Sequence, residues 1–188
     1  MQSYDLAIEA TWLLPIAPDN HALGEQTVLI KDGLIAAVQN TQDGPAYQAT
    51  RTLCLDHHIV MPGLVNAHGH AAMTLLRGAG EDQALQDWLR DTIWPMEAKL
   101  VAAPFCALGV ELAAAEMIRT GTTTFADMYF FPEVTAQVVK RSGLRAQLGF
   151  PVMEFTNAWA DGVQDCFHKG LALHDEHRHS APVERPPL

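Results

Sequence analysis

The chain has few cysteines and few basic residues, and each shortage excludes a class of protein. Its 188 residues include three cysteines, Cys54, Cys106 and Cys166, which lie far apart and form no Cys-x-x-Cys pair. An odd number of distant cysteines argues against a disulfide framework and indicates reduced core thiols in a cytoplasmic protein. Lys and Arg number 12 against 22 Asp and Glu, so the net charge is −10. Scattered basic residues on an acidic chain exclude a nucleic-acid-binding surface.

The chain also lacks a long uninterrupted apolar run. Its most apolar stretch, residues 100–118, contains Pro104 and Glu111 and is therefore not expected to span a membrane. The first apolar segment contains Asp5 and Glu9 and has no basic leader, which argues against a signal peptide. With 48% hydrophobic and 18% charged residues, the composition is that of a soluble globular protein with a modest core.

The N-terminal part predicts a small β unit. Residues 4–14 and 50–55 favour strands, because they are rich in β-branched and apolar side chains. Between them, Asp32-Gly33 joins two short apolar runs. Asp-Gly in this context predicts a hairpin, since both central residues tolerate positive φ. No catalytic set is apparent in this part of the chain.

From Val60 onward, segments of strand and helix character alternate. Strands are predicted in the apolar run that begins at Val60, at 122–128 and at 144–152, and helices at 104–120, 132–142 and 161–177. The resulting order, β-α-β-α-β-α, predicts an α/β fold with parallel strands and right-handed crossovers.

Helix boundaries have their own signals. Pro104 and Pro132 suit first turns, and Gly121 and Gly143 suit the positions that follow a helix. Asp82 is a candidate cap for a further helix. That helix is expected to end or kink at Trp94-Pro95.

The chemistry is concentrated in His68 and His70, which follow an apolar run and Pro62-Gly63. In an extended strand, residues two apart share a face, so the two imidazoles would converge on one point. Gly69 between them leaves room for a metal or a substrate. A catalytic metal usually needs three or more protein ligands, so the pair is at most half of a metal site. On the tripeptide alone, the alternative is a strand end with two half-exposed histidines.

The stretch Met61-Pro62-Gly63-Leu64-Val65-Asn66-Ala67-His68-Gly69-His70 resembles the first-strand signature of the amidohydrolase superfamily. The likeness is greatest to triazine hydrolases and 5'-methylthioadenosine/S-adenosylhomocysteine deaminases, and it covers residues 4–174. It implies about three βα units of a (β/α) TIM-type barrel over residues 59–178. Part of a small β-sandwich domain would precede them over residues 1–58, and an irregular Pro-rich tail would follow over 179–188.

The resemblance also implies a reaction. His68 and His70 would bind a divalent metal, zinc by preference, with one metal in each complete active site. Bound water would supply hydroxide to a ring carbon that carries an amino group, and carboxylates would move the proton to the departing ammonia. The implied substrate is 5'-methylthioadenosine, S-adenosylhomocysteine or a related adenosine-type nucleoside.

Glu97 is the candidate substrate-binding residue. In these deaminases, a glutamate in a segment similar to Trp94–Lys99 binds the ribose hydroxyls. The alternative interpretation is an ordinary glutamate on a helix surface. Trp88 either lines the pocket or belongs to the core. Asp127, at the end of a predicted strand, either binds a metal or proton or is satisfied by backbone hydrogen bonds.

No catalytic residue is identified in the chain, because in the family the other metal ligands and proton-transfer groups follow later strands. A barrel of this type needs roughly 250 residues. The expectation is therefore a truncated chain that is inactive alone. The late histidines are not expected to replace the missing ligands: His168, His174, His177 and His179.

Two alternatives remain open. The first is a triazine- or guanine-type aminohydrolase or chlorohydrolase, whose substrate would offer Glu97 no ribose. The second is a non-catalytic fragment or interaction module. No nucleic-acid or membrane partner is expected, and the complete enzyme could be a homo-oligomer.

Overall fold

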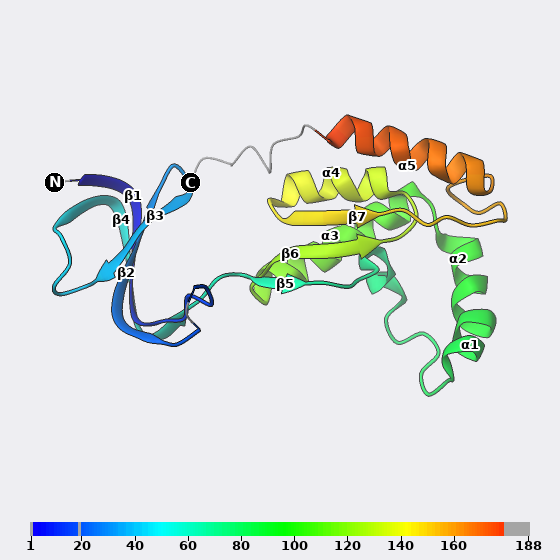
Figure 1. Ribbon diagram of the computed structural model, residues 1–188. Coiled ribbons are helices and arrows are strands. Elements are labelled where there is room, and N and C mark those ends of the chain that lie inside the picture. Colours follow the sequence, from blue (N-terminus) through cyan, green and yellow to red (C-terminus); the bar gives the residue numbers. More distant parts are fainter. Residues whose placement is uncertain (1, 19, 179–188) are drawn as a thin grey trace. The chain divides into compact units, whose positions relative to one another are not determined.

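The computed structural model describes residues 2–18 and 20–178, which form two compact units (Figure 1). The first unit ends at Pro62 and the second begins at Gly63. Within the described residues, no single helix is long and apolar enough to cross a membrane. One pair of helices, bent by 113°, passes this test on length and composition when the two are taken together.

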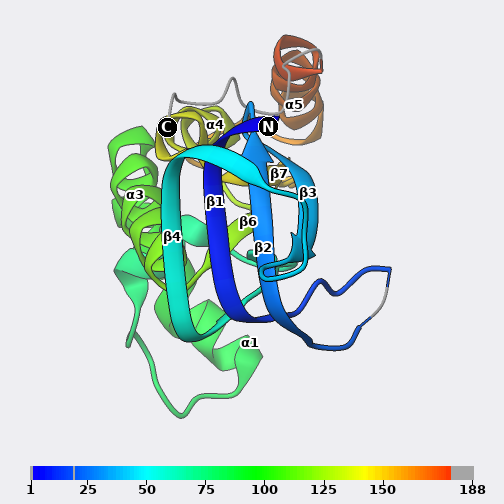
Figure 2. The same ribbon diagram turned by 90° about the vertical axis from the view of Figure 1, so that its left-hand side faces the viewer.

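The first unit is a four-stranded sheet in the order β3-β2-β1-β4 (Figure 2). Its strands are β1 (Gln2–Leu13), β2 (Leu23–Lys31), β3 (Leu34–Asn40) and β4 (Tyr47–Val60). β1 pairs antiparallel with β2 and parallel with β4. The predicted hairpin is confirmed, because Asp32 and Gly33 join β2 to β3 with φ of 51° and 67°.

The burial of the cysteines agrees with the prediction at two positions and differs at one. Cys106 and Cys166 are fully buried, as predicted. Cys54 is exposed on β4, where its thiol donates a hydrogen bond to Glu9 Oε2 at 3.3 Å. The prediction of a core thiol is wrong at Cys54, because the alternation of the strand places its side chain on the solvent side.

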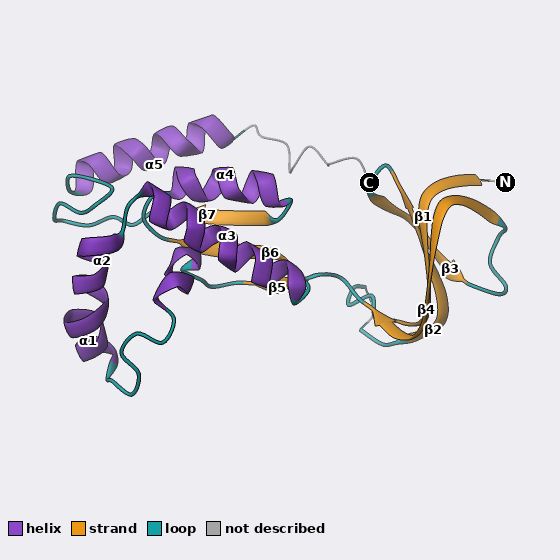
Figure 3. Cartoon of the chain, turned by 180° about the vertical axis from the view of Figure 1, so that it is seen from behind, coloured by secondary structure: helices purple, strands orange, loops and turns teal. Residues whose placement is uncertain are grey.

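The second unit contains a parallel three-stranded sheet in the order β5-β6-β7, which confirms the predicted strand direction. Its strands are β5 (Leu64–Asn66), β6 (Thr122–Met128) and β7 (Arg145–Gly149). Helices α3 (Ala103–Arg119) and α4 (Pro132–Ser142) pack against the sheet, and α5 (Val163–His177) follows β7 (Figures 1 and 3). The main core joins α3, α4 and β6 through side chains such as Val110, Phe125 and Val138.

Several predicted boundaries are confirmed. Pro104 and Pro132 lie in the first turns of α3 and α4. Gly121 and Gly143 follow these helices with φ of 84° and 75°, a conformation that favours glycine.

The segment between β5 and α3 differs most from prediction. It contains a 3₁₀ turn, η1 (Ala71–Leu76), then α1 (Leu85–Trp88), a π-helical stretch, η2 (Leu89–Ile93), and α2 (Trp94–Leu100). The cap predicted at Asp82 is wrong, because Ala84 occupies the N-cap position and Asp82 has φ of 61°. Pro95 lies in the first turn of α2, so the helical path continues past it.

Candidate metal centre and adjoining pocket

His68 and His70 lie in the loop that follows β5, which ends at Asn66. Their ring centroids are 5.1 Å apart, and the ring planes meet at 81°. His68 is exposed and His70 is half-buried. The two rings therefore lie close together, in a loop and not in the extended strand that the sequence predicted.

The orientation of His70 is set by the neighbouring strand. Its Nδ1 lies 2.7 Å from the carbonyl oxygen of Met128, at the end of β6. Met128 N in turn donates to the carbonyl of Gly69 at 3.2 Å. A neutral imidazole that donates from Nδ1 presents Nε2 as a lone-pair donor, the arrangement usual for histidines that bind zinc.

Asp127 forms a hydrogen bond to the backbone that directly follows His70. It is 5% exposed, and its Oδ1 accepts a hydrogen bond from Ala71 N at 2.6 Å. Burial raises the pKa of this carboxyl, while the bond from Ala71 and the nearby His70 act in the opposite direction. Of the two interpretations of Asp127, the structure supports a carboxylate satisfied by backbone.

The donor atoms fit two ligand positions of a divalent metal. Across residues 2–18 and 20–178, no group of three or more His, Cys, Asp or Glu side chains could hold a metal ion. His168, His174 and His177 lie on α5 and form no such group within these ranges. His179 lies outside the described residues.

Glu97 lies on α2 and is half-buried. Its Oε1 accepts a hydrogen bond from the hydroxyl of Tyr129 at 2.6 Å. Glu97 also lines a pocket of about 510 Å³, whose other walls include Trp94, Phe130 and Phe155. A carboxylate beside apolar and aromatic walls suits a ligand with vicinal hydroxyls and a flat ring.

Sequence reasoning missed Phe155, which lies in the loop after β7 and lines the pocket. This residue carries no local signal, because its place in the pocket depends on packing. Tyr129 directly follows Met128 at the end of β6, and its contact with Glu97 likewise depends on packing. Trp88 is half-buried, and its Nε1 donates to the carbonyl of Ala79 at 2.8 Å.

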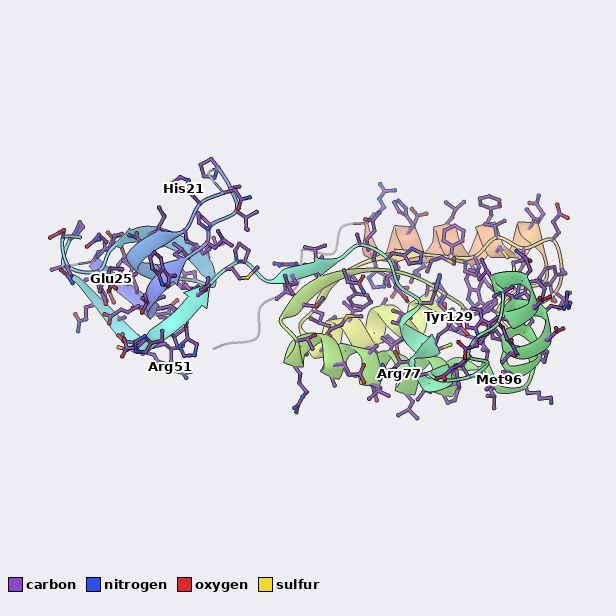
Figure 4. All side chains as sticks on the ribbon, turned by 90° about the horizontal axis from the view of Figure 1, so that it is seen from below. His21, Glu25, Arg51, Arg77, Met96 and Tyr129 are labelled. Carbon is purple, nitrogen blue, oxygen red and sulfur yellow. The ribbon has the colours of Figure 1, made fainter. Side chains whose placement is uncertain are left out.

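Three consecutive residues at the end of β6 form hydrogen bonds to the candidate site. Asp127 accepts one from the backbone of Ala71, the carbonyl of Met128 bonds to His70, and Tyr129 donates one to Glu97. Figure 4 marks Tyr129 together with Met96, which precedes Glu97 on α2. The candidate metal ligands and the pocket carboxylate are thus attached to one strand end.

Comparisons with known proteins agree with this arrangement. Residues 59–182 match the Amidohydrolase family. The 5-methylthioadenosine/S-adenosylhomocysteine deaminase of Teredinibacter turnerae is 44% identical over 175 residues, which are 93% of this chain and 40% of that protein. The 5'-deoxyadenosine deaminase of Methanosarcina barkeri is 45% identical over 154 residues, which are 81% of this chain and 34% of that protein. The chain thus spans well under half the length of these relatives.

Solved structures show the same likeness. An adenosine deaminase from Xanthomonas campestris with bound zinc is 40% identical, with a TM-score of 0.93 over 97% of this chain and 42% of that chain. The atrazine chlorohydrolase of Arthrobacter aurescens, complexed with zinc, is 18% identical with a TM-score of 0.78. The match spans 94% of this chain and 44% of the chlorohydrolase chain, and it shows a likeness of fold alone.

Proposed function

The chain belongs to the amidohydrolase family, and on that premise we propose that it forms part of a metal-dependent enzyme that deaminates an adenosine-type nucleoside by hydrolysis. The proposed substrates are 5'-methylthioadenosine and S-adenosylhomocysteine, in keeping with the names of the relatives. The observation that carries the proposal is the pair His68 and His70 at the end of β5, with His70 oriented by the Met128 carbonyl.

His68 and His70 are the proposed metal ligands, and zinc is the proposed metal, one in each complete site. Support comes from the donor set and from the zinc in the Xanthomonas deaminase structure. When bound, zinc would act as a Lewis acid that makes a nucleophile available from water at neutral pH. The role of the protein here is to hold both rings close together and to keep Nε2 of His70 available.

Glu97 is the proposed ribose-binding residue. Its carboxylate can accept hydrogen bonds from two neighbouring hydroxyls, and the apolar walls of the pocket shield these bonds from water. Trp94 and Phe155 offer aromatic surface beside it. A guanine or triazine substrate has no ribose, so it would make no use of Glu97.

The proposed architecture follows from the family. Residues 1–58 would be the N-terminal share of a small β-sandwich domain, and residues 59–178 would be three βα units of a (β/α) barrel. The Pro-rich tail, 179–188, lies outside the described residues. In such barrels, functional groups follow the C-terminal ends of strands, as His68, His70 and Tyr129 do here.

Metal binding tests the first part of the proposal. Calorimetric titration of the purified chain with zinc should show binding. His68→Ala and His70→Ala should each weaken the zinc affinity by about tenfold or more. His57→Ala and His58→Ala, which change a histidine pair on β4, are the matched controls and should leave the affinity unchanged. Equal losses in both pairs would contradict the assignment.

Nucleoside binding tests the second part. Glu97→Gln should weaken the binding of adenosine and leave the binding of guanine unaffected, because guanine has no ribose. Tighter binding of guanine than of adenosine to the unaltered chain would favour the guanine-type alternative.

A further inference from the structure

We infer that Tyr129 is a positioning residue, which aims the carboxylate of Glu97 at the ribose hydroxyls of a bound nucleoside. The inference deepens the proposed function and rests on it, because Glu97 acts on the substrate through a ribose. Its structural basis is the bond of 2.6 Å from the Tyr129 hydroxyl to Glu97 Oε1.

The ring of Tyr129 is held firmly. It is 6% exposed and belongs to the main core of the second unit, with Val101 and Phe125. It also packs edge-on against Phe130, with ring centroids 5.1 Å apart and planes at 69°. Because Tyr129 directly follows β6, its hydroxyl has a fixed place relative to the sheet.

Glu97, in contrast, is only half-buried on its helix. All seven residues of α2 are described, and none of them is buried. The helix is anchored by its buried neighbours, Ile93 before it and Val101 after it. A long side chain on such a helix would sample several rotamers, and its ordering would oppose ligand binding. The bond from Tyr129 restrains Glu97 before a ligand arrives.

The bond also leaves the carboxylate free to act. A carboxylate has about four acceptor positions, and Tyr129 uses one of them on Oε1. Oε2 has no hydrogen-bond partner in the described part of the chain. Since the phenol is a neutral donor, its bond forms no ion pair with Glu97, and the carboxylate can still accept bonds from hydroxyls. Burial, and then the bond to Glu97, raise the pKa of Tyr129, so the phenol remains a donor at physiological pH.

The end of β6 connects the two proposed binding groups, the metal ligand His70 and the ribose carboxylate of Glu97. Met128 holds His70, and the next residue, Tyr129, holds Glu97. The distance between the metal ligands and the ribose carboxylate is therefore set by neighbouring residues of one strand. This suits a nucleoside, in which a single glycosidic bond joins the ribose to the ring that reacts.

Calorimetry on the full 188-residue chain tests the inference with two probes, adenosine and 2',3'-dideoxyadenosine. Tyr129→Phe keeps the ring and removes the hydroxyl. We expect it to weaken adenosine binding about tenfold and to leave dideoxyadenosine binding unchanged. In the Glu97→Gln background, Tyr129→Phe should have no further effect. Tyr4→Phe, which alters an equally buried tyrosine of the first unit, is the matched control.

The outcomes separate the inference from the proposed function. Equal losses for both probes, or the same loss in the Glu97→Gln background, would overturn the positioning role and leave the function standing. Equal binding of both probes to the unaltered chain, or no binding of either, would contradict the proposed function. In that case, the NMR chemical shift of Tyr129 Cζ tests the hydrogen bond to Glu97. The shift should change in Glu97→Gln, and an unchanged shift would overturn the inference.

Discussion

At the scale of single residues, burial decides what a carboxylate does. Asp127 is nearly inaccessible, and its oxygen satisfies the backbone of Ala71 directly after His70. A buried amide that loses its acceptor costs about 1–3 kcal/mol. Asp127 therefore contributes both to the stability of the second unit and to the placement of His70.

Replacing this carboxylate tests both contributions. Asp127→Ala should lower the free energy of unfolding by about 1–3 kcal/mol, because Ala71 N–H is left without its acceptor. It should also weaken zinc binding, since the backbone at His70 is released. Urea unfolding and zinc calorimetry are the measurements. Glu154→Ala, at an exposed loop position, should change stability by less than about 0.5 kcal/mol. Equal effects of the two variants would argue against the role of Asp127.

Thiol reactivity is a second property of single residues. The hydrogen bond to Glu9 raises the pKa of the Cys54 thiol, which lowers the fraction of reactive thiolate at a given pH. Glu9→Gln should lower that pKa, move the pH profile of alkylation by iodoacetamide toward lower pH, and raise the rate at pH 8 several-fold. Asp56→Asn should act more weakly, because Asp56 contributes least to the shift.

The other thiols serve as an internal reference in the same experiment. Cys106 and Cys166 are fully buried, and burial raises the pKa of Cys106 to about 12. Neither should react in the folded chain. A Cys54 rate that does not depend on Glu9 would contradict the hydrogen bond.

At the scale of elements, close approach of backbones determines where η1 lies. A Cβ added at Gly109 of α3 would collide with the backbone of Ala72 in η1. The glycine thus lets α3 contact the turn that directly follows His70. Side-chain volume at this one position controls the fit of two elements that lie far apart in the sequence.

Gly109→Ala tests that contact. In an isolated helix, alanine would be favourable, but here it should lower stability by about 1–3 kcal/mol through overpacking. Thermal unfolding followed by circular dichroism at 222 nm reports the helices of the second unit. Leu108→Ala, at the exposed neighbouring position, should have a much smaller effect. A stabilised Gly109→Ala variant would contradict the close approach.

At the scale of the whole molecule, the proposed activity depends on the number of metal ligands. The described residues contribute two histidines and no cluster of three possible ligands. The purified chain with added zinc should therefore release no measurable ammonia from 5'-methylthioadenosine. An enzyme-coupled ammonia assay is the measurement, and release at a rate proportional to bound zinc would contradict the prediction.

The sheet of the second unit leads to a further expectation at this scale. In the part of the chain that is described, β5 and β7 each pair with β6 alone, and Val65 on β5 is 68% exposed. Unpaired strand edges favour self-association, and an edge lysine suppresses it. Sedimentation should show concentration-dependent association that Val65→Lys reduces. Leu171→Lys, at an exposed position on helix α5 and away from any strand edge, should reduce it less. A monodisperse monomer at every concentration would contradict the expectation.

The sequence alone determined the elements whose signals are local. The Asp32-Gly33 hairpin and the limits of α3 and α4 were predictable, because proline, glycine and side-chain periodicity act within a few residues. Parallel strands followed from the alternation of strands and helices. His68 and His70 were identified as a pair because their motif is contiguous.

The tertiary structure alone decided how these parts meet. The 3₁₀ turn after His70 has no local sequence signal, because its contact with α3 overrides propensity there. The π-helical stretch before α2 has no local signal either. The contact of Tyr129 with Glu97 joins residues 32 positions apart. Such a contact depends on the path of the whole chain, so no pattern of neighbouring residues could predict it.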